Sequence, residues 1–282
     1  MLSRKLKAYV DLTRPVNVAI TFLSIPAASV LAGAHVGQWM EIAIAGLTGG
    51  LVAAAANSIN DYFDVEIDRI NKPARPIPRG DATKKDAWFE WLFLSIVAVV
   101  LNFWLNEYAL AIVLFAVGIL YWYSASLKRM MIVGNLVVGL MTGMAFIYGA
   151  IVIGNMRRAA MPAIFAFLIN VVREVIKDVE DIEGDRKGNA LTLPVRYGIG
   201  PALWFASGAI ALLIAATIAA YQLGLYTVLF LYPVLVVDLL LLAVMIGMWK
   251  DQKPLTMNRL SNVLKVCMVL GLLAIFLGSL KD

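Results

Sequence analysis

The sequence has little charge and almost no cysteine or histidine. Only 15% of its 282 residues are charged, whereas about 25% is usual for a soluble domain, and 61% are hydrophobic. An ordinary water-soluble globule and a disordered chain are therefore excluded. One Cys and one His exclude a disulfide framework and leave too few soft ligands for a zinc site. What remains is a chain suited to a lipid bilayer.

Nine stretches are long and apolar enough to cross a bilayer. A spanning helix needs about 20 mostly apolar residues, and it satisfies its own backbone hydrogen bonds without water. The stretches are 16–34, 42–62, 87–105, 107–124, 132–153, 159–178, 201–222, 225–249 and 262–280. The predicted fold class is an all-α membrane protein of nine transmembrane helices, forming a single domain over 1–282.

The basic residues are unevenly distributed between the two sides of this arrangement. With the N-terminus in the cytosol, 21 of the 24 Lys and Arg residues lie on the cytosolic side. The positive-inside rule predicts such a bias. We therefore expect a multi-pass protein of the cell membrane with its N-terminus and active-site loops in the cytosol and its C-terminus outside. The net charge of +5 follows from this topology and does not indicate nucleic-acid binding.

Two cytosolic connections, about 63–86 and 179–200, are long and polar, and long connections tend to be functional. The first contains a proline-rich run, 72–79, for which an extended course is expected. The chemistry of the chain is expected at these two connections.

Acidic residues form two windows that repeat each other. The windows hold ten of the 19 acids, and a shift of 117 residues places 61–69 on 178–186. Both read Asp-x-x-Asp-x-Glu-x-Asp-Arg at the end of an apolar stretch. Because these stretches are the second and sixth, they run in the same direction, as a parallel repeat requires.

The spacing places the oxygen ligands of each window on one stripe of a helix. The first stripe is Asn57, Asp61, Asp64 and Asp68, and the second is Glu174, Asp178, Asp181 and Asp185. Two such stripes facing each other would repel unless cations lay between them. Oxygen ligands favour Mg²⁺, which usually binds one or two carboxylates and completes its shell with water and phosphate. The surplus of carboxylates indicates two ions bridging a diphosphate. The alternative, that the acids only solvate two helix ends, is disfavoured by the match between the windows.

Basic side chains are expected at the same depth. Arg suits bidentate contact with phosphate, and Lys acts as a point charge. The candidates are Arg69, Arg75, Arg79, Lys128, Arg129, Lys177 and Arg186. The alternative for each is contact with anionic membrane lipids.

The two motifs, together with Arg14-Pro15 and the 123–129 segment, resemble the UbiA superfamily of intramembrane prenyltransferases. Within it, the Arg-Pro-Ile-Pro run and the second motif look most like archaeal digeranylgeranylglyceryl phosphate synthases. The resemblance implies nine helices around a central cavity that the two Asp-rich connections cap on the cytosolic side. It also implies Mg²⁺-dependent transfer of geranylgeranyl from its diphosphate to the free hydroxyl of geranylgeranylglyceryl phosphate. The implied metal ligands are Asn57, Asp61, Asp64, Asp68, Asp178, Asp181 and Asp185; Glu174 departs from the Asn of the first motif.

Roles follow for the remaining candidates. The expected catalytic residues are Asp61, Asp68, Asp181, Asp185 and Lys128; the expected substrate-binding residues are Arg14, Arg69, Arg75, Arg79, Tyr123, Lys128, Arg129 and Lys177. Arg14, Arg75 and Arg79 are candidates for a second pocket that binds the acceptor phosphate. Either Asp68 or Asp185 could accept the hydroxyl proton. Tyr123 either contacts the diphosphate region or belongs to the interfacial belt.

Other functions stay open at this point. An aromatic acceptor such as 4-hydroxybenzoate would use the same motifs. A cation transporter is disfavoured because every acid except the mid-span Asp238 lies toward a helix end or in a loop. For Asp238 a hydrogen-bonded structural role is favoured. No obligate protein partner is indicated; the expected partners are a prenyl diphosphate donor, a lipid-like phosphorylated alcohol and membrane lipids.

Overall fold

The protein is helical in the computed structural model, which describes residues 2–188 and 190–280. Its contacts divide it into two compact units. The first comprises Met1–Lys128 and Met144–Ala159, and the second comprises Arg129–Gly143 and Ala160–Asp282. One of the three boundaries along the chain, between Gly143 and Met144, falls within a helix, α7 (Val133–Val152). Each unit is described by itself.

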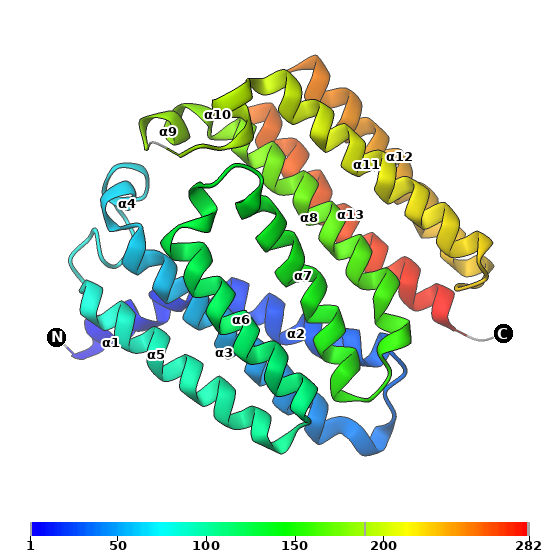
Figure 1. The fold of residues 1–282 in the computed structure, drawn as a ribbon, viewed down its shortest axis with the longest axis horizontal. Helices are drawn as coiled ribbons and strands as arrows, with labels where there is room; N and C mark the ends of the chain where they lie inside the picture. Colours follow the sequence, from blue (N-terminus) through cyan, green and yellow to red (C-terminus); the bar gives the residue numbers. More distant parts are fainter. Residues whose placement is uncertain (1, 189, 281–282) are drawn as a thin grey trace. The chain divides into compact units, whose positions relative to one another are not determined.

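The first unit is organised around its third helix (Figure 1). Its helices are α1 (Leu2–Thr13), α2 (Pro15–Leu31), α3 (Trp39–Phe63), α4 (Val65–Asn71), α5 (Lys84–Leu101), α6 (Glu107–Ala125) and the second half of α7. Helix α3 packs against α1, α2, α5 and α6. Because lipid is as apolar as leucine, close packing and hydrogen bonds hold such helices together.

Small residues allow that close packing. A Cβ atom added to Gly46 of α3 would lie 2.9 Å from the Pro26 ring of α2. One added to Gly149 of α7 would lie 2.7 Å from the carbonyl oxygen of Ile25. The Ser29 hydroxyl also donates to the Gly149 carbonyl at 2.8 Å, so α2 and α7 are joined by a polar contact as well.

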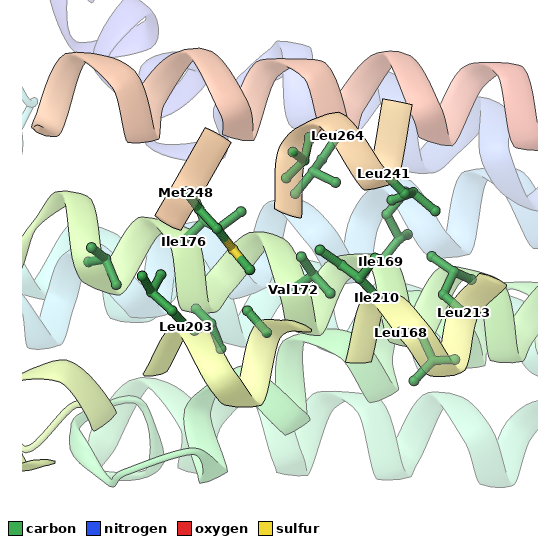
Figure 2. Close-up of a cluster of buried hydrophobic side chains, with 14 of the residues drawn as sticks. Leu168, Ile169, Val172, Ile176, Leu203, Ile210, Leu213, Leu241, Met248 and Leu264 are labelled. Carbon is green, nitrogen blue, oxygen red and sulfur yellow. The ribbon is translucent and has the colours of Figure 1, made fainter. Parts of the chain in front are cut away.

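The second unit has a long apolar core between four helices. Its elements are the first half of α7, α8 (Ala160–Glu180), α9 (Ile182–Lys187), α10 (Leu193–Tyr197), α11 (Ile199–Gln222), α12 (Leu231–Lys250) and α13 (Pro254–Ser279). Figure 2 shows side chains from all four helices along this core, among them Ile176, Leu203, Leu241 and Leu264. The Thr217 hydroxyl of α11 donates to Asp238 of α12 at 3.1 Å, the hydrogen-bonded role expected for that acid.

Each predicted stretch corresponds to one helix, and the chain is a multi-pass membrane protein. Among the described residues, eight helices are long and apolar enough to cross a membrane by themselves. Helix α2 has 17 residues and is long enough to cross a membrane only together with α1, from which it is bent by 48°. By length and composition, the described residues therefore contain eight candidate spans, or nine if the bent pair is one span.

The two long connections contain short helices and turns. Helix α4 lies in the first, and α9 and α10 lie in the second. The extended course expected for 72–79 is wrong, because this run forms successive turns. Proline carbonyls still accept hydrogen bonds: the amide of Asp81 donates to the Pro76 oxygen at 2.9 Å and closes the last turn.

Candidate functional site

The two acidic motifs interrupt their helices at the same matched position. Asp64 separates α3 from α4 with φ −93° and ψ 6°, and Asp181 separates α8 from α9 with φ −97° and ψ 9°. Backbone hydrogen bonds continue through both breaks. The amide of Asp68 donates to the Asp64 oxygen at 2.8 Å, and that of Asp185 donates to the Asp181 oxygen at 2.9 Å. The repeat predicted from the sequence is therefore also a repeat of local structure.

Two buried aspartates of the first motif share one arginine. Asp61 is 3% exposed and Asp68 is 4% exposed, so each requires a partner for its charge. The Arg75 guanidinium lies 3.2 Å from Asp61 and also pairs with Asp68. These two carboxylates therefore lie on one side of the motif, as their spacing predicts.

Arg14 adds a second cation to Asp61. Its Nη2 atom lies 2.5 Å from the Asp61 carboxylate. Arg14 occupies the bend between α1 and α2 with φ 54° and ψ 75°, a left-handed conformation that is uncommon outside glycine. Backbone strain of this kind gathers at functional sites. Here it coincides with a side chain that holds a motif carboxylate.

Lys128 and Asn57 complete the first motif. The Lys128 ammonium lies 2.6 Å from Asp64 and 2.8 Å from the Asn60 side-chain oxygen. The Asn57 amide donates to the Thr13 carbonyl at 2.7 Å and thereby ties α3 to the end of α1. Asp64 and Asn57 thus have partners different from those of Asp61 and Asp68.

Neutral donors hold two aspartates of the second motif. The Asn135 amide of α7 donates to Asp178 at 2.7 Å, and the Thr192 hydroxyl donates to Asp185 at 3.1 Å. Burial raises the pKa of Asp185 above its ordinary value, and the neighbouring charge of Asp181 raises it further. Asp181 itself is exposed.

The charged neighbours on α8 pair with Glu174. The Arg173 guanidinium lies 3.0 Å from one Glu174 oxygen, and the Lys177 ammonium lies 3.0 Å from the other. Lys177 was expected to bind substrate, and in this structure its partner is Glu174.

Three other predicted substrate ligands lie elsewhere. Arg69 pairs with Glu66 at 2.9 Å on the surface. Arg79 contacts Asp81 and Asp11, and these hydrogen bonds raise the pKa of Arg79. Arg129 is exposed in the second unit, where its carbonyl oxygen accepts the Leu191 amide at 3.1 Å.

For the two remaining candidates, Tyr123 and Arg186, the structure gives the position and the exposure of the residue. Tyr123 is half-buried on α6, and Arg186 is exposed on α9.

Sequence reasoning missed three polar residues that support the motifs. They are Asn135, Asn60 and Glu90, the last of which accepts the Ser58 hydroxyl at 2.8 Å. Asn135 and Glu90 carried a usable signal, because each is a polar residue within an apolar stretch and such residues need a partner.

The donor chemistry of the first motif suits a divalent ion. Across residues 2–188 and 190–280, no three His, Cys, Asp or Glu side chains are gathered into a ready-made metal site. However, Asp61 and Asp68 already share one positive group, the Arg75 guanidinium. Hard carboxylate oxygens that can share one cation are the ligands that Mg²⁺ prefers.

A cleft adjoins the first motif. Its volume is about 560 Å³, and it is lined by Asp11, Pro15, Lys72, Pro73, Ala74, Arg75 and Pro76. Arg75 therefore belongs both to the motif and to this cleft.

These features define an integral membrane protein with an acidic motif repeated at the ends of two membrane helices. A family model described as the UbiA prenyltransferase family matches residues 20–266, and the chain belongs to this family. It is therefore a prenyltransferase by family.

Similar proteins cover its whole length. The chain is 36% identical to a digeranylgeranylglyceryl phosphate synthase of Thermococcus sibiricus, with 98% of each chain covered. It is 37% identical to the synthase of that name from Methanopyrus kandleri, covering 98% of this chain and all of the relative. A solved structure described as digeranylgeranylglyceryl phosphate synthase in membranes is 30% identical, with a TM-score of 0.84 and 99% of each chain covered.

A more distant structure supports the fold alone. It is a UbiA homologue from Archaeoglobus fulgidus bound to GPP and Mg²⁺. It is 20% identical, has a TM-score of 0.69 and covers 95% of this chain and 99% of its own.

Proposed function

We propose that this protein transfers a geranylgeranyl group from geranylgeranyl diphosphate to the free hydroxyl of geranylgeranylglyceryl phosphate, with Mg²⁺ as cofactor. The observation that carries the proposal is the acidic motif that recurs with the same backbone break in a member of a prenyltransferase family. The relatives that carry the synthase name cover nearly the whole chain and support the choice of acceptor.

The first motif offers carboxylates for the metal and cations for the diphosphate. Asp61, Asp64 and Asp68 would hold Mg²⁺ together with Asn57, and Arg75 and Lys128 would turn toward diphosphate oxygens. Mg²⁺ supplies Lewis-acid stabilisation of the negative charge on the departing diphosphate. The arginine and lysine side chains add electrostatic stabilisation at the same oxygens.

The second motif is proposed to bind the same diphosphate through Asp178, Asp181 and Asp185. Support comes from the sequence repeat and from the excess of carboxylates over what one ion takes. In the transfer, the bond between C1 and the diphosphate oxygen breaks, and a bond forms between C1 and the acceptor oxygen. The hydroxyl proton passes to a carboxylate, for which Asp68 and Asp185 are candidates. An apolar surrounding keeps water from the cationic C1.

The acceptor phosphate is proposed to enter the cleft beside the first motif. Arg75 and Lys72 line this cleft and supply positive charge, and Arg14 contacts the same Asp61 oxygen as Arg75. Arg79, also predicted for this role, is held by Asp11, which itself lines the cleft.

The membrane arrangement belongs to the same proposal. It has nine spans in a single domain, the two acidic connections form a cytosolic cap, and the C-terminus lies outside. The basic residues of the sequence support this topology.

The test is a radiolabelled prenyl-transfer assay on purified protein in membranes. We expect a digeranylgeranyl product from geranylgeranyl diphosphate and the glyceryl phosphate acceptor, and its loss with EDTA. Preferential prenylation of 4-hydroxybenzoate would show that the proposed acceptor is wrong, whereas the assignment to the prenyltransferases would stand. Absence of any transferred prenyl group with all acceptors would reject the proposed function.

A further inference from the structure

Helix α1 has apolar residues on two opposite faces. Ala8 and Leu12 are buried in a cluster that includes the start of α5. Leu6 and Val10, by contrast, are 66% and 48% exposed. Because a helical turn takes 3.6 residues, residues 6 and 10 lie on the side of the helix opposite to residues 8 and 12. Packing against the rest of the protein therefore explains only one of the two faces.

Polar contacts determine which face of α1 points outward. The Tyr9 hydroxyl donates to Asp86 at the start of α5 at 2.8 Å, and the Lys5 ammonium lies 3.4 Å from the same carboxylate. At the other end of α1, the Thr13 carbonyl accepts the amide of Asn57, which belongs to α3, at 2.7 Å. Helix α1 is thus held against the ends of two membrane helices, and its exposed face is a fixed feature of the first unit.

The exposed face of α1 is followed in the chain by an exposed apolar stripe on α2. Val16, Ile20 and Leu23 are exposed, and their spacing of four and three residues places them on one side of α2. Such a stripe on a membrane helix contacts lipid, whose chains are as apolar as leucine. At 1.5 Å per residue, the 17 residues of α2 cover about 25 Å of a hydrocarbon core that is about 30 Å thick. Lipid therefore extends past the ends of α2, and at its N-terminal end the next helix is α1.

A basic residue borders the exposed face of α1. Lys7 is exposed and lies three residues before Val10, on the neighbouring side of the helix. Unlike Arg4 and Lys5, it takes part in no ion pair within the described part of the first unit. A lysine in this position can lay its methylene groups along an apolar stripe while its ammonium reaches phosphate oxygens. Exposed apolar residues bordered by lysine are typical of amphipathic helices that bind an anionic membrane surface.

We propose that α1 is a membrane-surface helix whose partner is the anionic headgroup region of the bilayer. Leu6 and Val10 enter the boundary between headgroups and acyl chains, about 5–10 Å deep, and the Lys7 ammonium contacts lipid phosphates. This contact goes beyond the proposed function and does not depend on the transfer reaction. It adjoins the first motif, because Arg14 directly follows α1 and contacts Asp61.

Fluorescence quenching in lipid nanodiscs tests the depth of this face. A bimane label is attached to a single cysteine in the full-length protein, with the buried Cys267 replaced by alanine. Lipids that carry a nitroxide close to the headgroup should quench the labels of Leu6→Cys and Val10→Cys most strongly. A nitroxide deep in the acyl chain should act most strongly on the label of Leu23→Cys. Neither lipid should quench the label of Glu66→Cys, whose position on α4 is exposed and polar.

Two results would overturn the proposal. Labels at residues 6 and 10 that escape quenching, like the label at residue 66, would place the outward face of α1 in water. Labels at residues 6 and 10 that respond like the one at residue 23 would place α1 within the hydrocarbon core, and α1 would then be part of a span and not a surface helix.

The charge of the lipid is tested with the same label at residue 6. In mixed nanodiscs, nitroxide phosphatidylglycerol should quench this label more strongly than nitroxide phosphatidylcholine. Lys7→Gln should lower that preference by up to about fivefold, the effect of one basic residue at an anionic surface. The matched control Lys253→Gln removes the same charge from an exposed residue between α12 and α13 and should keep the preference. Equal quenching by the two lipids would overturn the anionic headgroup as partner, and an equal effect of the two substitutions, or none in Lys7→Gln, would overturn the contact of Lys7.

Discussion

Asp64 and Asp181 have the same backbone conformation although 117 residues separate them. Each ends a long helix and begins a short one, and each accepts a backbone hydrogen bond from the aspartate four residues later. The similarity ends at the side chains. Asp64 is paired with Lys128, whereas Asp181 is exposed. Substitutions at equivalent positions of the two motifs should therefore have different effects on the stability of the protein, even if both positions are needed for activity.

Asp61→Asn and Asp181→Asn should each abolish prenyl transfer, but only the first should destabilise the protein. Asp61 is buried and pairs with Arg14 and Arg75, so its loss removes the carboxylate that Arg14 contacts and leaves Arg75 paired with Asp68 alone. Breaking a buried ion pair costs about 3–5 kcal/mol. Asp181 is exposed, so its substitution should leave stability nearly unchanged. Thermal unfolding in detergent alongside the transfer assay checks both expectations; retained transfer in both variants contradicts the metal assignment.

Arg75→Ala should destabilise the protein by about 3 kcal/mol or more, because Asp68 loses its ion pair and Asp61 loses one of two. Arg75→Lys should recover only part of the lost stability, since one ammonium cannot reproduce the fork of a guanidinium. The matched control is Arg69→Ala, which breaks an exposed pair with Glu66 and should cost about 0–1 kcal/mol. Chemical denaturation in detergent measures all three. If Arg75→Ala and Arg69→Ala destabilised the protein equally, the buried ion pairs of Arg75 would contribute no more than an exposed pair, which would contradict this prediction.

Hydropathy and spacing predicted the helices and the repeat because both depend on local pattern. Each predicted apolar stretch contains one helix, and the 117-residue shift appears again in the backbone of Asp64 and Asp181. The turns at 72–79 were missed because proline removes donors but leaves its carbonyl free to accept, as at Pro76. Local pattern carries no information on that pairing.

Partner choice was the part that sequence could not provide. Arg69, Arg75 and Arg79 are alike in type and lie close together in the chain, yet only Arg75 reaches the motif aspartates. Which acid each one meets depends on how the connection folds. The sequence showed that Glu174 departs from Asn57 of the first motif, but only the structure shows that its carboxylate pairs with Arg173 and Lys177.

Gly149→Ala should destabilise the first unit. A Cβ atom there would lie 2.7 Å from the backbone oxygen of Ile25, so α7 and α2 would have to separate. Overpacking of this kind typically costs about 1–3 kcal/mol. The control is Gly118→Ala on α6, where no described residue beyond the adjacent turns of its own helix comes within 4 Å of the added Cβ, and the higher helix propensity of alanine should stabilise slightly. Unfolding measured in parallel should separate the two variants; a loss in Gly118→Ala similar to that in Gly149→Ala would show that packing is not the cause.

Low pH should release α1 from the connection that precedes α5. Arg4 lies 2.5 Å from Asp81, which also pairs with Arg79. Burial raises the pKa of Asp81, but the hydrogen bonds from Arg79 and Arg4 outweigh it and hold the pKa below its ordinary value. Because the pKa is lowered in the folded state, the stabilisation is complete above the ordinary value of about 3.9 and is lost as the pH falls through the lowered one.

The difference in Tm between the unaltered protein and Asp81→Asn should accordingly be constant from neutral pH down to about pH 4 and vanish in more acidic solution. Glu66→Gln provides the control, because its pair with Arg69 is exposed and joins two residues of the same short helix. It should leave Tm nearly unchanged at every pH. A difference between Asp81→Asn and the unaltered protein that persists after Asp81 is protonated would mean that the side chain acts through packing, and the ion pairs with Arg4 and Arg79 would then contribute nothing to holding α1.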